Sequence, residues 1–423
     1  MDIVLISVFS TLIILLALAV PIGVSLGIAA LVGMYMGNMD FTMFIQRLYS
    51  TFDSFPLLAV PFFVLAGDIM QQGTIAGSLL NFCRTLTGHL TGALSHVSVL
   101  TCLFYGALSG SAPATTAAVG GIMIPAMEKD NYPKSYATAL NAAGGCLGVL
   151  IPPSVPLILY GSSVGCSISD LFLAGIIPGL VVGSIFMVLC YVTAKKRKYG
   201  VVHPKTSARE RFQALWEARW ALMVPVIVLG GIYGGIVTPT EAGALAVVYA
   251  LFVECFITKS MTPTLLRSIL FTSLKTTGTI FFVVATANAL SIVLVYFNAH
   301  EMLCNLITAI SSTKVGIILT LAVVFMVLGT FVEVSIVILV LSPMLMPLLD
   351  IIQMNQVQFG LFMLVILATG FLTPPVGLNL FVAAGLSDLP VSIIAARCIP
   401  YCIIMLVVGL AIGFIPQLTL FLL

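Results

Sequence analysis

Long apolar segments separated by short polar breaks run along the whole chain. An apolar stretch of roughly 20 residues is long enough to cross a bilayer as a helix. In the first half, a more amphipathic stretch at 75–90 interrupts apolar segments that are expected at 3–20, 22–37, 54–70, 93–108, 114–127, 135–147, 155–165 and 171–194. This pattern predicts an all-α polytopic membrane protein.

The second half repeats this plan. Spans are expected at 220–237, 240–258 and 278–297, with an amphipathic stretch at 262–276, a hairpin around 328–331, and further segments at 357–369, 376–386 and 392–421. We therefore predict two repeats, 1–194 and 220–423, joined by a polar linker over 195–219.

Two motifs support this duplication. Gly148 to Pro153 reads GVLIPP and Gly370 to Pro375 reads GFLTPP, and these hold the only two Pro-Pro dipeptides of the chain. Adding 222 to positions 148, 150, 152 and 153 gives the same residue types. A helix that is interrupted at one corresponding place in each half is typical of secondary transporters whose binding site lies near mid-membrane.

A short polar break also precedes each motif. Ser109 to Pro113 separates two half-length apolar pieces, and Leu328 to Phe331 occupies the comparable place in the second half. Irregular backbone at membrane depth is tolerated only where protein or a water-filled cavity surrounds it. We therefore expect a re-entrant helical hairpin in each repeat.

Composition restricts the possible functions. The chain is 60% hydrophobic and 8% charged, whereas soluble domains carry about 25% charged residues. The basic residues form no stripe or groove, so nucleic acid is not an expected partner. The chain is not expected to be an enzyme, because its four histidines are dispersed. It also lacks the Gly-Lys-Ser/Thr loop of an ATP-driven pump.

Basic residues predict the orientation in the membrane. Cytoplasmic loops are enriched in Lys and Arg, and eight of these residues fall within 195–219. With an odd number of crossings per repeat, the repeats are inverted and both termini lie outside. Seven more basic residues then fall on the cytoplasmic side, and only Arg47 and Lys314 fall outside.

Interrupted helices and hairpin tips together suggest ion binding. A proline at a break leaves a backbone carbonyl unpaired, and carbonyl and hydroxyl oxygens suit an alkali cation. The tip Ser109-Gly110-Ser111 supplies hydroxyls beside one broken helix, and Gly329-Thr330 lies comparably beside the other. We predict two sodium sites, one per repeat, with an anionic substrate between them near helix N-termini.

Several polar residues are candidates for substrate contact. Thr115, Asn141 and Asn379 lie at hairpin or broken-helix positions, and each either contacts a substrate carboxylate or forms an interhelical hydrogen bond; the sequence leaves both open. Glu333, just beyond the second tip, is a candidate for substrate contact, coupling or gating, because ionisable residues within a membrane are usually functional. Asp68 is expected at the interface.

One acidic residue has a structural explanation. Thr238, Pro239 and Glu241 occupy the N-cap, N1 and N3 positions of the helix that follows. In a capping box, the N-cap side chain and the N3 carboxylate bond reciprocally to the backbone. We therefore predict that Glu241 caps a helix and takes no part in transport.

Four segments resemble the large membrane subunit of tripartite ATP-independent periplasmic (TRAP) transporters. They read PLLAVPFF from Pro56 leading to Gly67, SGSAPAT from Ser109, IPPS from Ile151 and TPPVGLN from Thr373. The resemblance covers essentially the whole chain. It implies an elevator-type fold in which a scaffold carries a mobile transport domain, and sodium-driven import of organic acids such as C4-dicarboxylates or sialic acid.

The resemblance also implies particular ligands and partners. One sodium ion would be held around Ser109, Ser111, Gly148, Ile151 and Pro153, and a second around Gly329, Thr330, Gly370 and Thr373. The partners would be a small membrane subunit, a periplasmic binding protein and membrane lipid, at the bacterial inner membrane. Because the chain opens directly on the first large-subunit span, the small subunit is expected to be separate. A self-sufficient sodium/carboxylate symporter is the alternative.

Overall fold

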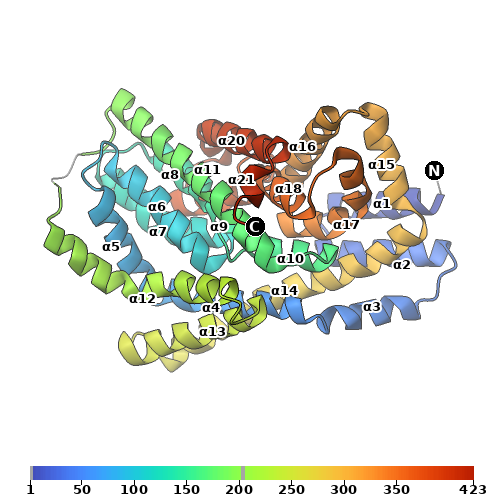
Figure 1. Ribbon diagram of the computed structural model, residues 1–423, viewed down its shortest axis with the longest axis horizontal. Coiled ribbons are helices and arrows are strands. Elements are labelled where there is room, and N and C mark those ends of the chain that lie inside the picture. Colours follow the sequence, from blue (N-terminus) through green and yellow to red (C-terminus); the bar gives the residue numbers. More distant parts are fainter. Residues whose placement is uncertain (1–2, 202–204) are drawn as a thin grey trace.

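The computed structural model describes residues 3–201 and 205–423, and within these the secondary structure is entirely helical. Nine helical segments in this described part are long and apolar enough to cross a membrane. The helices pack into one elongated molecule (Figure 1). The prediction of an all-α polytopic membrane protein is confirmed.

The first half contains the spans, the hairpin and the broken helix that the sequence predicts. Its helices are α1 (Ile3–Ala17), α2 (Ile22–Met36), α3 (Thr42–Phe52), η1 (Phe55–Leu58), α4 (Ala59–Gln72), α5 (Ile75–Thr87), α6 (Ala93–Ser109), α7 (Ala112–Lys129), α8 (Lys134–Gly145), α9 (Leu147–Leu150), α10 (Val155–Val164) and α11 (Ile168–Arg197). We refer to α6 and α7 as hairpin 1. The first broken helix comprises α8, α9 and α10.

The second half presents a similar series of elements, with one long helix, α14 (Pro263–Tyr296), where the first half has α3, η1 and α4. Its helices are α12 (Ala208–Tyr233), α13 (Pro239–Phe252), η2 (Val253–Ile257), α14 (Pro263–Tyr296), α15 (Ala299–Ile310), α16 (Lys314–Phe331), α17 (Val334–Ile352), α18 (Gln356–Gly370), α19 (Leu378–Ser387), α20 (Val391–Phe414) and α21 (Gln417–Leu420). Hairpin 2 is α16 and α17, and the second broken helix is α18 and α19. The hairpin ends at 109 and 112 recur 222 residues later, at 331 and 334.

Two groups of helices can be distinguished by their packing. In the first group, α4 packs against α13 and α14, and α14 also packs against α2 and α3. We call this group the scaffold. The second group contains the hairpins, the broken helices, α11 and α20. It meets the scaffold where α4 contacts α6 and where α14 contacts α17.

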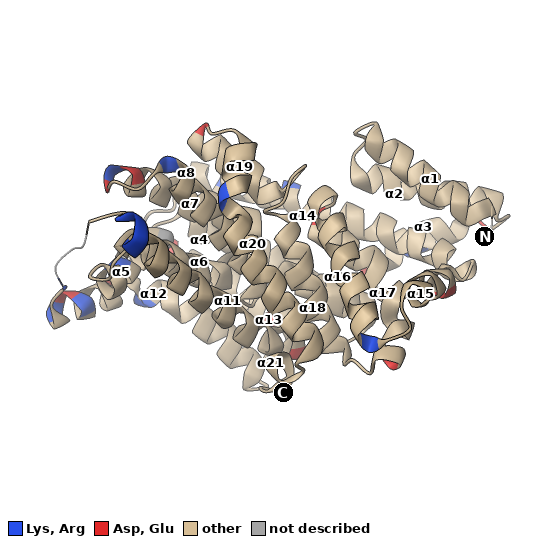
Figure 2. Ribbon diagram, turned by 90° about the horizontal axis from the view of Figure 1, so that it is seen from above, with Lys and Arg blue, Asp and Glu red and all other residues tan. Residues whose placement is uncertain are grey.

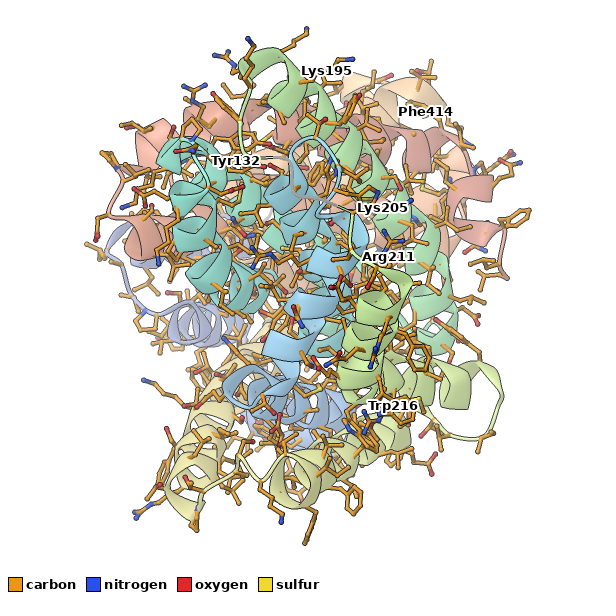
Figure 3. All side chains as sticks on the ribbon, turned by 90° about the vertical axis from the view of Figure 1, so that its left-hand side faces the viewer. Tyr132, Lys195, Lys205, Arg211, Trp216 and Phe414 are labelled. Carbon is orange, nitrogen blue, oxygen red and sulfur yellow. The ribbon has the colours of Figure 1, made fainter. Side chains whose placement is uncertain are left out.

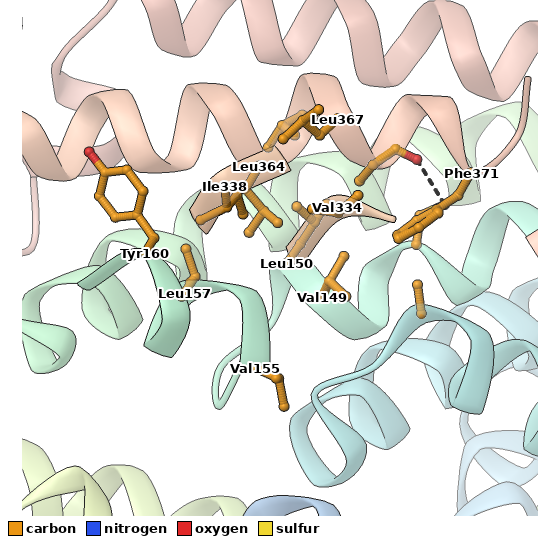
Figure 4. Close-up of a cluster of buried hydrophobic side chains, with 14 of the residues drawn as sticks. Val149, Leu150, Val155, Leu157, Tyr160, Val334, Ile338, Leu364, Leu367 and Phe371 are labelled. Carbon is orange, nitrogen blue, oxygen red and sulfur yellow. Dashed lines mark hydrogen bonds between the residues drawn. The ribbon is translucent and has the colours of Figure 1, made fainter. Parts of the chain in front are cut away.

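Within the second group, the repeats are interlocked. The second half of each broken helix packs against the hairpin of the other repeat, so that α10 lies on α17 and α19 lies on α7. A hydrogen bond between the Ser163 and Ser342 hydroxyls (3.0 Å) and one from the Tyr160 hydroxyl to the Gln356 carbonyl (2.7 Å) join the repeats. Apolar side chains fill the space between them, including Leu157, Ile338 and Leu364 (Figure 4).

The expected boundaries differ from the structure in one region of the second half. Residues 262–276 and 278–297 do not form two elements but one helix, α14, of 34 residues. Gly278 does not interrupt it, because an isolated glycine costs only about 1 kcal/mol in a helix. The amphipathic helix that corresponds to α5 is α15. Neither α15 nor α3 was predicted from the hydrophobic pattern.

The connection between the halves is shorter than the predicted polar linker. Helix α11 continues to Arg197 and α12 begins at Ala208, where the Ser207 side chain and Glu210 form a capping box. Charged residues of the linker therefore lie on helix ends. Lys and Arg residues gather at this end of the molecule, near α5, the α7–α8 turn and the facing ends of α11 and α12 (Figure 2).

Candidate functional site

The tip of hairpin 1 is a tight turn between two helix ends. Gly110 adopts a left-handed conformation (φ 60°), which glycine tolerates at little cost. Ser111 then caps α7, and its Oγ accepts a hydrogen bond from the Ala114 N–H at 3.4 Å. The turn places both serines and the start of α7 beside the first broken helix.

Several oxygen atoms cluster behind this tip. The hydroxyls of Ser109 and Thr115 are hydrogen bonded at 2.9 Å, and the Thr115 hydroxyl donates to the Ser111 carbonyl at 2.8 Å. The Ser109 hydroxyl lies 3.4 Å from the same carbonyl oxygen. Hydroxyl and carbonyl oxygens are ligands that hard cations accept. The structure therefore brings together Ser109, Ser111 and Thr115.

Gly148 lies against this oxygen cluster. A Cβ atom at Gly148 would lie 2.7 Å from the Ser111 carbonyl oxygen and would overlap the Thr115 hydroxyl. On the other side, a Cβ at Gly106 would lie 2.9 Å from Gly148 Cα. Only glycine lets α6 and the broken helix approach so closely.

The loop after Gly148 completes the contact between the tip of hairpin 1 and the first broken helix. We call this contact the first crossing, and the equivalent contact in the second repeat the second crossing. The Pro152–Pro153 peptide bond is cis, and the Val155 N–H donates to the Gly110 carbonyl at 3.3 Å. A Cβ at Gly110 would lie 2.6 Å from the Pro153 carbonyl oxygen. The Ile151 side chain packs against α11 at Gly179. The loop backbone is thus held directly against the hairpin tip.

The second crossing has the same construction. A Cβ at Gly370 would overlap the backbone of Gly329, so these two glycines touch. The Val376 N–H donates to the Thr330 carbonyl at 3.2 Å, and the Pro374–Pro375 bond is cis. In each repeat, therefore, a backbone hydrogen bond ties the broken helix to the hairpin tip.

The two threonines of the second crossing use their hydroxyls within their own segments. Thr330 Oγ1 donates to the Val327 carbonyl at 2.7 Å, and Thr373 Oγ1 donates to the Thr369 carbonyl at 3.1 Å. A hydroxyl that donates in this way keeps lone pairs for a cation. Thr330 lines a cavity of about 290 Å³ at this crossing, together with Gly329 and Gly377.

A cavity of about 280 Å³, the central cavity, lies between the scaffold and both hairpin tips. The scaffold contributes α4 and α14, with Gly67, Asp68, Gln71 and Thr276. The hairpins contribute Ser109 to Ala114 and Glu333, and the broken helices contribute Val149 and Phe371. Among these described lining residues, the charged ones are acidic, and none is Lys, Arg or His.

Glu333 lies at the start of α17 and lines both the central cavity and the cavity at the second crossing. Its two carboxylate oxygens accept from the backbone and side chain of Ser335, at 3.1 and 2.8 Å. It therefore caps α17. The same carboxylate is part of the wall between the two cavities.

The two predicted asparagines are buried away from the central cavity. Asn141 accepts from the Ser98 hydroxyl at 2.8 Å and donates to the Ala137 carbonyl at 2.8 Å. Asn379 donates to the Ala142 carbonyl at 3.0 Å and so joins the two broken helices. Their contacts are those of the interhelical alternative, and the structure does not bring them to the hairpin tips.

The scaffold side of the cavity was not anticipated. Asp68 lies four residues before the end of α4 at Gln72, and it accepts a hydrogen bond from Ser273 of α14 at 2.5 Å. Gly67 packs against hairpin 1, since a Cβ there would lie 3.2 Å from Ser109 Cα. An ionisable residue inside an apolar segment was the available signal for Asp68.

Glu241 has the structural role that its spacing predicts. The Thr238 side chain accepts from the Glu241 N–H, and the Glu241 carboxylate accepts from the Thr238 N–H at 2.8 Å. The predicted capping box is confirmed. Glu241 thus stabilises the start of α13.

The hairpins, broken helices and central cavity define a polytopic membrane transporter with two inverted repeats. Residues 9–418 match the family described as "Tripartite ATP-independent periplasmic transporter, DctM component". The chain belongs to this TRAP family of large permease proteins, as its motifs predict. The three relatives compared below are named as transporter permeases and not as enzymes.

Individual relatives match along most of this chain. It is 36% identical to the sialic acid TRAP transporter large permease SiaM of Vibrio cholerae (96% of each chain) and 36% identical to the C4-dicarboxylate permease DctM of Pseudomonas aeruginosa (88% and 87%). It is 37% identical to the isethionate TRAP transporter permease DctMQ of Oleidesulfovibrio alaskensis, covering 96% of this chain but only 64% of that protein.

A solved structure supports the fold independently. The YdaH transporter of Alcanivorax borkumensis superposes with a TM-score of 0.61 and covers 89% of both chains. The sequences are 15% identical. The likeness therefore concerns the fold alone.

Proposed function

We propose that this chain is the permease subunit of a sodium-coupled importer of organic acids. The main observation in support of this proposal is that two contacts between a hairpin tip and a broken helix flank one cavity of about 280 Å³. Relatives are named for C4-dicarboxylates, sialic acid and isethionate. All three substrates are small organic anions, and we infer the same class here.

The charge of the cavity supports coupling to a cation. Asp68 and Glu333 line it, without a basic side chain among the described lining residues. Two like unit charges 4 Å apart repel by about 4 kcal/mol at an effective dielectric constant near 20. An anion in this cavity would therefore need compensating positive charge, which co-bound sodium ions and the N-termini of α7 and α17 would supply.

The donor sets fit sodium. The first site would use oxygen atoms of Ser109, Ser111, Gly148, Ile151 and Pro153. The second site would use Gly329, Thr330, Gly370 and Thr373. Carbonyl and hydroxyl groups predominate in both sets, so a singly charged hard cation is a better match than zinc, which prefers Cys and His. Thr115 belongs with the first set, because its hydroxyl bonds to Ser109.

We propose that transport proceeds by an elevator movement of the hairpins and broken helices along the scaffold. Support comes from the close contact at the boundary, where Gly67 of α4 meets the backbone of Ser109. Small residues with no interlocking side chains permit sliding of one helix group past another. Helices α5 and α15 connect the scaffold to hairpins 1 and 2.

The partners we propose are a small membrane subunit and a periplasmic binding protein, at the inner membrane of a bacterium. Uptake of radiolabelled organic acids into proteoliposomes tests this assignment. We expect uptake only with an inward sodium gradient and a substrate-loaded binding protein. Uptake by the chain alone would favour a self-sufficient symporter, and uptake without sodium would refute the coupling.

A further inference from the structure

A separate cavity of about 610 Å³ lies at the basic end of the molecule, and we call it the basic-end cavity. It is formed by the last turns of α5, the turn leading to α6, and the segment that enters α12. Its polar lining includes Arg84, His89, Lys205, Thr206, Ser207 and Glu210. Its volume is within the usual range for small-ligand sites.

Basic side chains outnumber acidic ones around this cavity: Glu210 lines it, and Glu217 accepts from the lining residue Asn81 at 3.5 Å. Arg84 and Lys205 line it, and Arg211 lies next to it because its Nε donates to the hydroxyl of Thr206 at 3.4 Å. The Glu210 carboxylate is already engaged, since it accepts from the Ser207 N–H at 2.9 Å. Within 3–201 and 205–423, the one salt bridge joins Lys134 to Glu128. Lys205 precedes α12, and Arg211 lies in the first turn of that helix (Figure 3).

Two buried nitrogen atoms beside the cavity lack a partner. They are Nη2 of Arg211 and Nδ1 of His89, neither of which is hydrogen bonded to any described residue. A guanidinium nitrogen is always a donor, and a buried donor without an acceptor is unfavourable. An acceptor-rich ligand that reached Nη2 of Arg211 would supply the missing acceptor.

We propose that the basic-end cavity binds a phosphate-bearing anion, either a phospholipid headgroup or free inorganic phosphate. Phosphate offers several acceptor oxygens in the geometry that arginine recognises; Arg84 and Lys205 line the cavity, and Arg211 contacts its lining residue Thr206. Exposed aromatic side chains of Phe212 and Trp216 on α12 stack next to the basic residues. Trp is enriched at the membrane–water interface, which favours a lipid headgroup.

Such a ligand would bind where the segment that enters α12 is attached to α5. The Thr206 hydroxyl donates to the Thr85 carbonyl of α5 at 2.7 Å, so the segment between the repeats is already fastened to α5. Helix α5 leads through residues 88–92 into hairpin 1. A bound phosphate would strengthen this attachment and restrict the movement of α5.

Native mass spectrometry of the full chain in nonionic detergent tests the proposal. Phosphatidylglycerol is titrated against phosphatidylcholine of the same chain length. We expect preferential binding of phosphatidylglycerol. The double variant R84Q/K205Q should bind it roughly 25-fold more weakly, about fivefold for each charge removed, the equivalent of about 1 kcal/mol per residue. Both residues are exposed, so the core is not disturbed.

A matched control removes two basic residues from the same end without altering the cavity. Lys129 and Lys196 are exposed, and K129Q/K196Q should retain binding within about twofold, as should the charge-preserving R84K/K205R within about fivefold. Equal binding by R84Q/K205Q and the control would overturn the proposal. So would equal weakening in R84K/K205R, or equal affinity for the two lipids.

Inorganic phosphate identifies the source of the ligand. Displacement of phosphatidylglycerol from the wild-type chain by millimolar phosphate would assign the site to the free ion. Retention of the lipid would assign it to a headgroup. Both results support a phosphate site, provided that R84Q/K205Q no longer binds the ligand so identified, whether phosphatidylglycerol or inorganic phosphate.

Discussion

The contact between Gly148 and hairpin 1 leaves no room for a methyl group. In Gly148→Ala, the new Cβ would lie 2.7 Å from the Ser111 carbonyl oxygen, which is 0.7 Å short of the 3.4 Å at which ordinary contact begins. It would also overlap the Thr115 hydroxyl. The hairpin tip must then move away, or Thr115 must leave its position and lose its hydrogen bonds to Ser109 and Ser111.

The size of the effect follows from these contacts. Inserting a methyl group into a packed site costs about 1–3 kcal/mol, and each lost hydrogen bond adds about 1 kcal/mol. If the substitution destabilises the sodium-bound state by about 2–3 kcal/mol relative to the sodium-free state, the half-saturating sodium concentration should rise roughly 30- to 150-fold. The oxygen cluster is the part that the methyl group displaces.

The assay is uptake into proteoliposomes at increasing external sodium, with saturating binding protein and substrate. Gly121→Ala is the matched control, because Gly121 lies in hairpin 1, against which Gly148 packs, and a Cβ there meets nothing within 4 Å. This control should leave the sodium dependence unchanged. Thermal melting of both variants separates a loss of fold from a loss of ion affinity.

A normal sodium curve for a correctly folded Gly148→Ala protein would refute the reasoning. It would mean that the oxygen cluster behind the tip contributes nothing to ion binding. A shifted curve in Gly121→Ala would be equally damaging, since that methyl group has no neighbour to displace.

Three further changes test other parts of the site. Ser109→Val and Thr373→Val should each raise the half-saturating sodium concentration about tenfold or more without reducing membrane abundance, and unchanged sodium activation in both would count against the two sodium sites. Glu333→Gln keeps an acceptor for the α17 cap but removes a negative charge, so we expect weaker sodium binding and, at saturating sodium, tighter binding of the acid; two unchanged titration curves would exclude a role for the charge. Thr238→Ala removes the capping box of α13 and should lower stability by about 1 kcal/mol, seen as a lower melting temperature, while a change in sodium dependence would contradict its purely structural role.

Most of the fold could be predicted from local sequence patterns, because the lengths of the apolar segments and the positions of the Pro-Pro breaks can be read directly from the sequence. The end of α6 at Ser109 and the breaks after Leu150 and Gly370 appear where expected, whereas residues 328–331 form the last turn of α16 and the tip of hairpin 2 follows it at Val332 and Glu333. Helix α14 was misjudged, because its polar first half resembles a separate amphipathic helix. Most of that half is exposed, but Ser273 is buried where it bonds to Asp68 of α4, 205 positions earlier in the sequence.

The candidate site was predictable only as far as its motifs extend. Ser109 and Gly148 belong to breaks that can be recognised in the sequence. Gly106 does not, because it matters only through its contact with Gly148, 42 positions away. A Cβ at Gly106 would lie 2.9 Å from Gly148 Cα. Asn141 and Asn379 have the same residue type as many ligand-binding residues. Their buried partners, Ser98 and Ala142, become evident only once the helices are assembled.

The exchange of contacts between the repeats bears on how such a chain arose. Helix α10 rests on α17, and α19 rests on α7, so an isolated half would expose an apolar surface on both its hairpin and its broken helix. A single-repeat ancestor would therefore have lacked these packing partners unless a second copy supplied them. Gene fusion would then have fixed a one-to-one stoichiometry and freed each half to diverge, as Ile151 and Thr373 at equivalent positions have done.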